Sequence, residues 1–164
     1  MKNRSLLMIP GPIEFEPAVL SALGAPTTSH VAPDFIETFG QALERMREVF
    51  LCPDGQPFVV AGSGTLAMDL AGANLIEPGD KALVVNTGYF GDRFGDLLSR
   101  YGAEVTHIRA PIGGRPALGD VEAALRTGDY KLVTITHVDT STGVVTDVQA
   151  LTAAARANGA LSIV

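Results

Sequence analysis

The sequence is poor in several kinds of residue, and each scarcity excludes a class of protein. Cys52 is the only cysteine, so the chain cannot form an internal disulfide, which suits a reducing compartment. The apolar run after the basic N-terminus breaks at Pro10, too early for a signal peptide, and no later run approaches the ~18 residues of a membrane span. We therefore expect a cytoplasmic protein with no membrane partner.

Charge is scarce as well, and its sign does not suit nucleic acid. Charged residues make up 18% of the 164 residues, and the net charge is −6. Lysine and arginine are scattered singly, so no basic stripe is present to neutralise the phosphates of a nucleic acid. Hydrophobic residues make up 46%, which is typical of a globular domain. We expect a folded protein with no nucleic-acid partner.

Histidine and cysteine are too few to predict a metal site. The histidines are His30, His107 and His137, and none has further donors at metal-ligand spacing. His107 falls within a strand pattern, which favours a structural role. Cys52 precedes a proline at the end of a helical pattern and has no evident histidine partner, so we expect a packing residue rather than a nucleophile.

Short apolar runs alternate with helical patterns over most of the chain. Residues 1–33, punctuated by prolines, are expected to form an extended arm. The apolar spacing of residues 33–50 predicts a helix that starts at Pro33 or Asp34. Beyond it, runs rich in Val, Ile and Leu predict strands, each followed by a helical pattern. This alternation predicts an α/β fold, a mostly parallel sheet with helices on both faces. The expected strands are residues 57–62, 81–86, 103–110, 130–138 and 160–164, and the later helices are residues 65–76, 91–102, 118–128 and 147–159.

Three polar loops follow predicted strands, at residues 62–65, 86–90 and 137–142. In an open parallel sheet, ligands bind beyond the carboxyl ends of the strands. These loops are therefore the candidates for a binding site.

The first loop, Gly-Ser-Gly-Thr at residues 62–65, opens a predicted helix. Glycines let the backbone approach an anion, and the helix N-terminus adds N–H donors to the hydroxyls of Ser63 and Thr65. The loop therefore suits a phosphate group. A plain capped helix, with Ser63 or Thr65 as the cap, explains the same residues.

The other two loops carry an aromatic pair and a run of polar side chains. Tyr89 and Phe90 either pack in the core or offer a face for a planar ring to stack on. The loop at residues 137–142 gathers many hydrogen-bonding groups, partly as turn chemistry and partly as a means of holding a polar ring substituent.

Seven motifs follow one another in the order and spacing found in one enzyme family. They are "IPGP", "SH-x-x-P-x-F", "AGSGT", "EPGD", "NTGYFGDRF", "YGAEV" and "THVDTSTGV", and together they span essentially the whole chain. On these motifs the sequence resembles the class V aminotransferases, most closely the alanine–glyoxylate members of the fungal kind. These are fold-type I enzymes that use pyridoxal 5′-phosphate (PLP).

The resemblance implies a role for residues of all three loops. Residues 63–65 match the cup for the cofactor phosphate, and Phe90 matches the aromatic residue that stacks on the pyridine ring. Thr140 matches a hydroxyl that hydrogen-bonds near the ring, and His137 lies in the same loop. The cofactor residues so implied are Ser63, Gly64, Thr65, Phe90, Thr140 and His137. The arm residues that match the substrate pocket are Pro10, Gly11 and Pro12.

The resemblance also implies what the chain does not contain. In the family, the aspartate that pairs with the pyridine nitrogen and the Schiff-base lysine lie further along the chain than Val164 does here. We assign no catalytic residue, because Lys81 and Lys131 both fall at strand starts, at the opposite edge of the sheet. We expect an N-terminal fragment, with residues 1–33 as an arm and residues 34–164 as the first part of the PLP-binding large domain.

The expected activity of the intact protein follows from the same resemblance. It is a transaminase that moves an amino group from alanine or serine to glyoxylate or a related small 2-oxoacid, as a homodimer with PLP. Two alternatives remain open. One is another class V PLP enzyme, such as a serine–pyruvate or phosphoserine-type aminotransferase, and the other is a non-catalytic binding or assembly module if the chain is naturally this short.

Overall fold

The computed structural model describes residues 5–164, which fall into two compact units. One unit joins the residues up to Ile13 to Ser63–Val164, and the other is Glu14–Gly62. The division of the chain into an arm over residues 1–33 and a domain over residues 34–164 stays a prediction.

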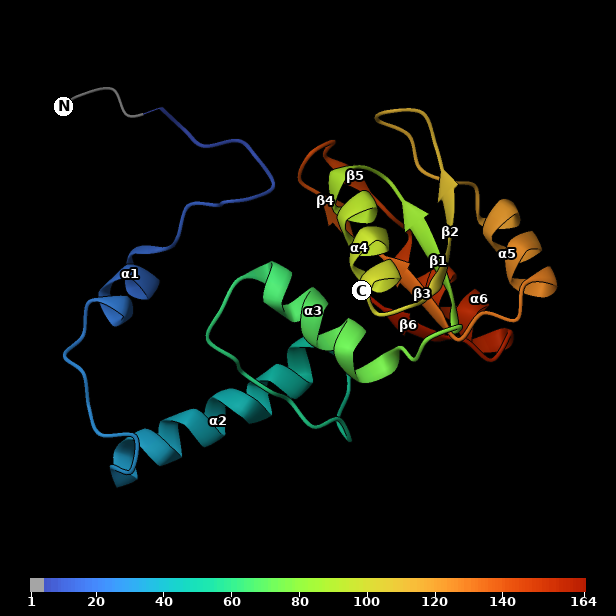
Figure 1. Ribbon diagram of the computed structural model, residues 1–164. Coiled ribbons are helices and arrows are strands. Elements are labelled where there is room, and N and C mark those ends of the chain that lie inside the picture. The colour runs from blue at the N-terminus through green and yellow to red at the C-terminus, as the bar shows by residue number, and fades with distance from the viewer. Residues whose placement is uncertain (1–4) are drawn as a thin grey trace. The chain divides into compact units, whose positions relative to one another are not determined.

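The larger unit is built on a four-stranded sheet with the order β2-β1-β3-β6 (Figure 1). All three neighbouring pairs are parallel, and Ala82 of β1 lies opposite both Val105 of β2 and Leu132 of β3. The parallel sheet that the sequence predicts is confirmed. The strands are β1 (Lys81–Asn86), β2 (Glu104–Arg109), β3 (Leu132–Ile135) and β6 (Leu161–Ile163).

Helices cover both faces of this sheet, as predicted. On one face, Leu83 and Val85 of β1 pack in a core with α5 (Leu118–Thr127) and α6 (Val148–Ala157). On the other face, the alternate residues of the strands, such as Ala82 and Leu132, pack with α3 (Gly64–Leu75) and α4 (Tyr89–Arg100). This follows because successive side chains of a strand point to opposite sides of the sheet. The core of this second face is formed by Ile76, Ala82, Phe94, Leu97, Leu98 and Leu132.

The segment after β3 differs from expectation. A single strand was expected over residues 130–138, but β3 ends at Ile135, and the chain then forms a small antiparallel pair. Its strands are β4 (Val138–Asp139) and β5 (Val144–Val145), with Asp139 opposite Val144. The hairpin forms because the backbone N–H groups of Thr142 and Gly143 both donate to the carbonyl oxygen of Asp139.

The Glu14–Gly62 unit holds α1 (Pro17–Leu23) and α2 (Pro33–Val49). The second helix was predicted with its start at Pro33 or Asp34, whereas the first replaces part of an arm expected to be extended. The strand expected over residues 57–62 is absent from the described structure. An apolar run needs a neighbouring strand to pair with, and Phe58, Val59 and Val60 have exposed side chains and no such partner.

None of the helices between residues 5 and 164 has both the length and the apolar character that crossing a membrane requires.

Candidate functional site

The first turn of α3 is held by a side-chain cap. The backbone of Ser63 is extended, with φ −89° and ψ 164°, and its Oγ accepts the N–H of Leu66 at 3.2 Å. This is the capped start that the sequence predicts for residues 62–65. The space in front of Gly64 is open, because a Cβ added there would meet no heavy atom within 4 Å. Apart from that of Leu66, the first N–H groups of the helix have no partner inside it, and such groups favour an anion.

A cavity of about 330 Å³ lies beside this turn, at the carboxyl ends of β3 and β6. Most of its walls are apolar side chains from α3, α4 and β3, with a few polar groups at the loop. Its lining residues are Gly64, Ala67, Met68, Phe90, Phe94, Ile135, Thr136, His137, Ile163 and Val164.

Phe90 contributes an aromatic wall to this cavity. It is the second residue of α4 and is half-buried, and its ring meets that of Tyr89 edge to face at 5.3 Å between ring centres. Tyr89 itself is exposed. Of the two aromatic residues that the sequence offers for stacking, Phe90 is the one that lines the cavity.

Thr140 lies against the N-terminal arm rather than in the cavity wall. Its side chain is exposed, and a Cβ added at Gly11 would lie 3.3 Å from its Cγ2. The peptide bond from Gly11 to Pro12 is cis. The arm residues expected in the substrate pocket thus run close to the loop after β3.

The structure brings together some of the expected site residues and separates others. Gly64, Phe90 and His137 line one cavity, and Ser63 caps the helix that starts there. Thr65 lines a different hollow of about 170 Å³ between α3 and α4. The sequence did not predict Met68, Phe94, Ile135 and Thr136 as cavity residues, although Ile135 and Thr136 could be inferred from their place at the end of an apolar run.

A network of hydrogen bonds ties the loop after β3 to the start of α4. The N–H of Tyr89 donates to Oγ of Ser141 at 2.9 Å, and Oγ1 of Thr142 donates to the carbonyl oxygen of Thr87 at 2.9 Å. Ser141 in turn donates its hydroxyl and its backbone N–H to Oδ1 of Asp139. These bonds fix two of the three predicted loops relative to one another.

A second network of hydrogen bonds, centred on Asn86, supports the turn between β1 and α4. Asn86 at the end of β1 accepts the N–H of Gly88 at 3.1 Å and donates to Oδ1 of Asp92 at 2.9 Å. The side-chain amide nitrogen of Asn86 also lies 3.0 Å from Nδ1 of His107. Because the amide nitrogen is a donor, Nδ1 accepts and the imidazole is neutral.

The charges near this network shift two pKa values. Burial lowers the pKa of the His107 imidazole, and the Arg109 guanidinium lowers it further. The pKa of the Asp92 carboxyl is also lowered, first by the hydrogen bond from Arg109 and then by the one from Asn86. The contact between Asn86 and Nδ1 of His107 supports the structural role that the strand pattern predicts for His107.

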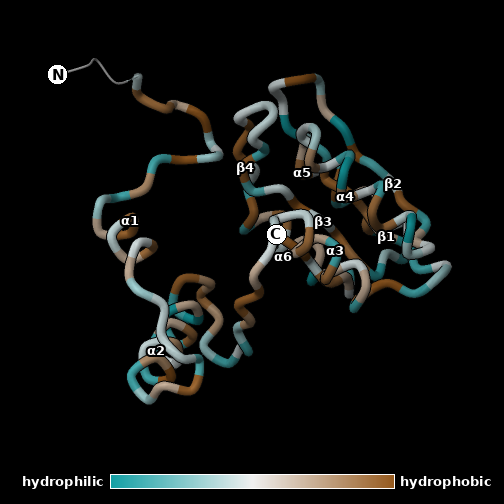
Figure 2. The backbone as a smooth tube through the Cα atoms, turned by 60° about the vertical axis from the view of Figure 1, so that its left-hand side comes forward, coloured by the Kyte–Doolittle hydropathy of each residue, from teal (hydrophilic) through white to brown (hydrophobic). Residues whose placement is uncertain are grey.

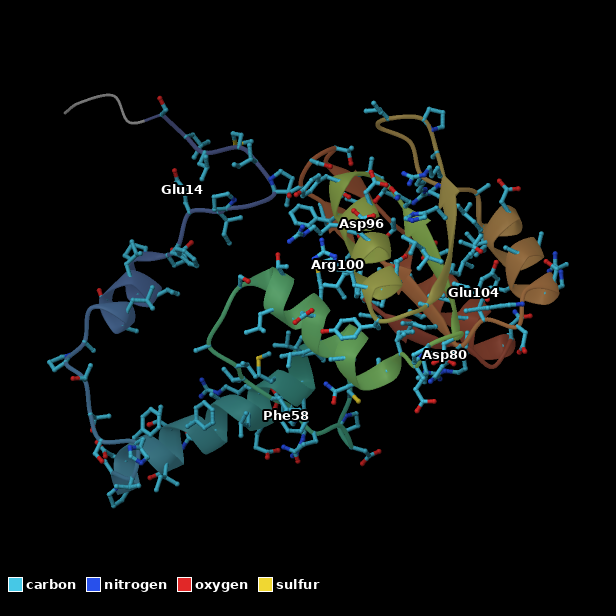
Figure 3. The ribbon with its side chains drawn as sticks, viewed as in Figure 1. Glu14, Phe58, Asp80, Asp96, Arg100 and Glu104 are labelled. Atoms are coloured by element: carbon cyan, nitrogen blue, oxygen red, sulfur yellow. The ribbon has the colours of Figure 1, made fainter. Side chains whose placement is uncertain are left out.

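The two lysines nearest the sheet lie at its opposite edge. Lys81 begins β1, and Lys131 precedes β3 and pairs with Oδ2 of Asp80 at 2.6 Å, which lowers the pKa of that carboxyl. Figure 3 labels Asp80 and Glu104 at this edge, where the N–H of Glu104 donates to the carbonyl oxygen of Asp80 at 2.8 Å.

The part of the chain that the structure describes contains no group of three or more His, Cys, Asp or Glu side chains placed to hold a metal ion.

This fold is that of a class of proteins, the fold-type I PLP-dependent aminotransferases. The solved structure of an alanine–glyoxylate aminotransferase from Nostoc sp. matches 99% of this chain with a TM-score of 0.86 at 32% identity. The match covers 43% of that chain.

Within that class, the chain belongs to the class V aminotransferase family, whose model matches residues 18–164. It is 42% identical over 160 residues to alanine–glyoxylate aminotransferase 1 of Saccharomyces cerevisiae, a match over 93% of this chain and 42% of the yeast protein. It is 32% identical over 154 residues to the L-aspartate–glyoxylate aminotransferase of Paracoccus denitrificans, a match over 92% of this chain and 39% of that protein. The chain thus spans less than half the length of these relatives.

The family's cofactor is PLP, and the cavity fits it. The volume of about 330 Å³ is at the lower end of the range for small-molecule sites. The apolar walls and the Phe90 ring suit a flat ring, and the open first turn of α3 suits a phosphate.

Proposed function

We propose that the protein to which this chain belongs is a PLP-dependent transaminase. The observation that carries the proposal is the cavity that brings Gly64, Phe90 and His137 together beside the open, Ser63-capped start of α3. A ring flanked by a phosphate needs an apolar slot that ends at an anion site, and this cavity offers both. Membership of the class V aminotransferase family supports the same reaction.

Each site residue has a binding task in this proposal. The first-turn N–H groups of α3, with the hydroxyl of Ser63, bind the cofactor phosphate, and Phe90 stacks on the ring. The phosphate role that the resemblance implies for Thr65 would require its hydroxyl to turn out of the separate hollow that it lines. Thr140 and His137 offer hydrogen bonds from the loop after β3. When bound, PLP supplies an electrophilic carbonyl and an electron-withdrawing ring. The apolar walls exclude water, which strengthens the polar contacts that remain.

We propose alanine or serine as the amino donor and glyoxylate or a related small 2-oxoacid as the acceptor. The names of the relatives support glyoxylate as acceptor, since it occurs in those of the yeast, Nostoc and Paracoccus proteins. The donor in those names is alanine or aspartate. The arm at Pro10, Gly11 and Pro12 lines the substrate side of the site in this proposal.

We also propose that the protein acts as a homodimer in the cytoplasm. Neither α1 nor α2 has a buried residue, although both carry large apolar side chains. Figure 2 shows hydrophobic stretches on α2 and on the segment that follows it. Apolar surface of this extent in the Glu14–Gly62 unit is typical of a protein interface. The single cysteine supports a reducing compartment.

The proposal is tested on the intact protein with PLP. Purified protein should bind PLP and convert glyoxylate to glycine with alanine or serine as donor, and aspartate serves as the comparison donor. A Phe90→Ala variant should bind PLP about tenfold more weakly, because it loses a stacking contact. Intact protein that folds but neither binds PLP nor transfers an amino group from any of the three donors would contradict the proposal.

A further inference from the structure

Asp139 is a fully buried carboxylate at the edge of the site, with part of its hydrogen-bonding capacity unused. Its side chain is 0% exposed, and Oδ1 accepts the backbone N–H of Ser141 at 3.0 Å and the hydroxyl of Ser141. Its Oδ2 has no hydrogen-bond partner within residues 5–164. Burying an incompletely paired carboxylate is costly, and so its place in the structure needs a compensating role.

The hydroxyl of Ser141 connects this carboxylate to α4. Because Ser141 donates its only hydroxyl proton to Asp139, the oxygen lone pairs are left to accept, and one accepts the N–H of Tyr89 at 2.9 Å. That N–H is the first of α4 and has no partner inside the helix. The next residue is Phe90, which lines the cavity. A bond that fixes Tyr89 therefore also fixes the ring beside it.

The backbone of Gly88 packs closely against Ser141 and Asp139. A Cβ added at Gly88 would lie 2.5 Å from Oγ of Ser141 and 2.8 Å from Oδ2 of Asp139. On the other side of the turn, Oγ1 of Thr142 donates to the carbonyl oxygen of Thr87. The loop after β3 thus contacts the turn between β1 and α4 at two points, and Asp139 lies at the point where the atoms are packed more closely.

We propose that Asp139 is a positioning residue of the cofactor site. Through Ser141 it holds the first turn of α4 against the loop after β3, and so sets the place of the Phe90 ring relative to His137. Asp139 is not among the residues that line the cavity. This inference rests on the proposed function, because the geometry that Asp139 fixes is that of the PLP slot.

The relay is tested first in the cofactor-free intact protein, by amide hydrogen exchange. Ser141→Ala removes the acceptor of the Tyr89 N–H, and the exchange rate of that amide should rise at least about tenfold. The matched control is Ser99→Ala, because the Ser99 hydroxyl donates to the carbonyl oxygen of Gly95 within the same helix. Exchange at Tyr89 should be unchanged in that control. An unchanged rate in Ser141→Ala would overturn the relay.

PLP affinity tests whether the relay positions the site. Asp139→Ala and Ser141→Ala should each weaken PLP binding about tenfold, and the double variant should also lose about tenfold, because both remove the same chain of bonds. A loss of about a hundredfold in the double variant would show independent effects and overturn the proposal. Where Asp139→Ala fails to fold, Asp139→Asn replaces it, with a smaller loss expected. Asp147→Asn, which keeps the cap of α6, is the control and should bind PLP as the wild type does.

The outcomes separate this inference from the proposed function. If the wild-type protein does not bind PLP, the proposed function is wrong, while the exchange experiment still decides whether the relay exists. If the wild type binds PLP and both Ser141→Ala and Asp139→Asn bind it equally tightly with an unchanged cofactor spectrum, Asp139 does not position the site and the proposed function stands.

Discussion

Gly88 separates β1 from α4 at a point where the loop after β3 comes within contact distance. We predict that Gly88→Ala lowers the free energy of unfolding by about 1–3 kcal/mol, because the added Cβ would lie 2.5 Å from Oγ of Ser141. Urea denaturation measures the effect. Gly119→Ala is the matched control, since no heavy atom lies within 4 Å of a Cβ at that helical position, and it should leave the stability equal or slightly higher.

His107 gives the fold a dependence on pH with a definite sign. Its pKa is lowered by burial, and so it lies below the value of about 6.5 for an imidazole in the unfolded chain. The unfolded state therefore binds more protons between the two pKa values. The contribution of His107 is fully present above pH 6.5 and is lost as the pH falls from there through the folded-state pKa.

We predict that the free energy of unfolding, measured in urea at a series of pH values, falls as the pH is lowered below about 6.5. His107→Gln has no titrating ring and should lack this step, while keeping the later loss that follows from the lowered pKa of Asp92. A step of equal size in His107→Gln would assign it to another group.

At the scale of elements, the N-terminus of α3 combines a structural and a binding task that substitutions can separate. Ser63→Ala should lower the free energy of unfolding by about 1 kcal/mol, because it removes the acceptor for the Leu66 N–H. Ser63→Asp keeps an acceptor and should retain near wild-type stability, yet it places a negative charge where we propose the phosphate.

Titration with PLP distinguishes the two substitutions. Ser63→Asp should bind PLP more weakly than Ser63→Ala does, although it is the more stable variant. Equal or tighter PLP binding by Ser63→Asp would place the phosphate elsewhere.

Most elements of the larger unit could be predicted because their cues are local. β1 was predicted at its observed bounds, and α4 ends before Gly102, whose φ of +90° favours glycine. The expected strand over residues 57–62 was wrong, since strand formation depends on a partner that no local pattern reveals. The β4–β5 hairpin was missed for a different reason, because the strand pattern over residues 130–138 continues without a break past Ile135, where β3 ends.

The candidate site shows the same division. Ser63 and Phe90 follow strand patterns and could be found from position alone. That Thr65 lines a separate hollow could not be predicted from the sequence, because this depends on how α3 packs on α4. The role that we infer for Asp139 depends on bonds to a helix far away in the sequence.

At the scale of the whole molecule, the exposed apolar side chains of the Glu14–Gly62 unit predict self-association. Phe39 is 39% exposed and Phe58 is 82% exposed, and Figure 3 labels Phe58 on its segment after α2. Replacing both by serine should weaken the dimer at least about tenfold in sedimentation equilibrium. The control is Ile112→Ser, which removes a single side chain, 97% exposed, from the other unit and should leave the dimer unchanged. If the double variant and Ile112→Ser dimerise with the same affinity, the dimer interface lies on another surface.

The contact of Gly11 with Thr140 has a consequence for how the protein is made. Residues up to Ile13 belong to the larger unit, and the whole of Glu14–Gly62 lies between them and the rest of that unit along the chain. At a translation rate of about 5–20 residues per second, the arm leaves the ribosome on the order of ten seconds before Thr140 has been synthesised. The arm must therefore wait for its native neighbour, and the cavity cannot form before β3 and β6 have been synthesised.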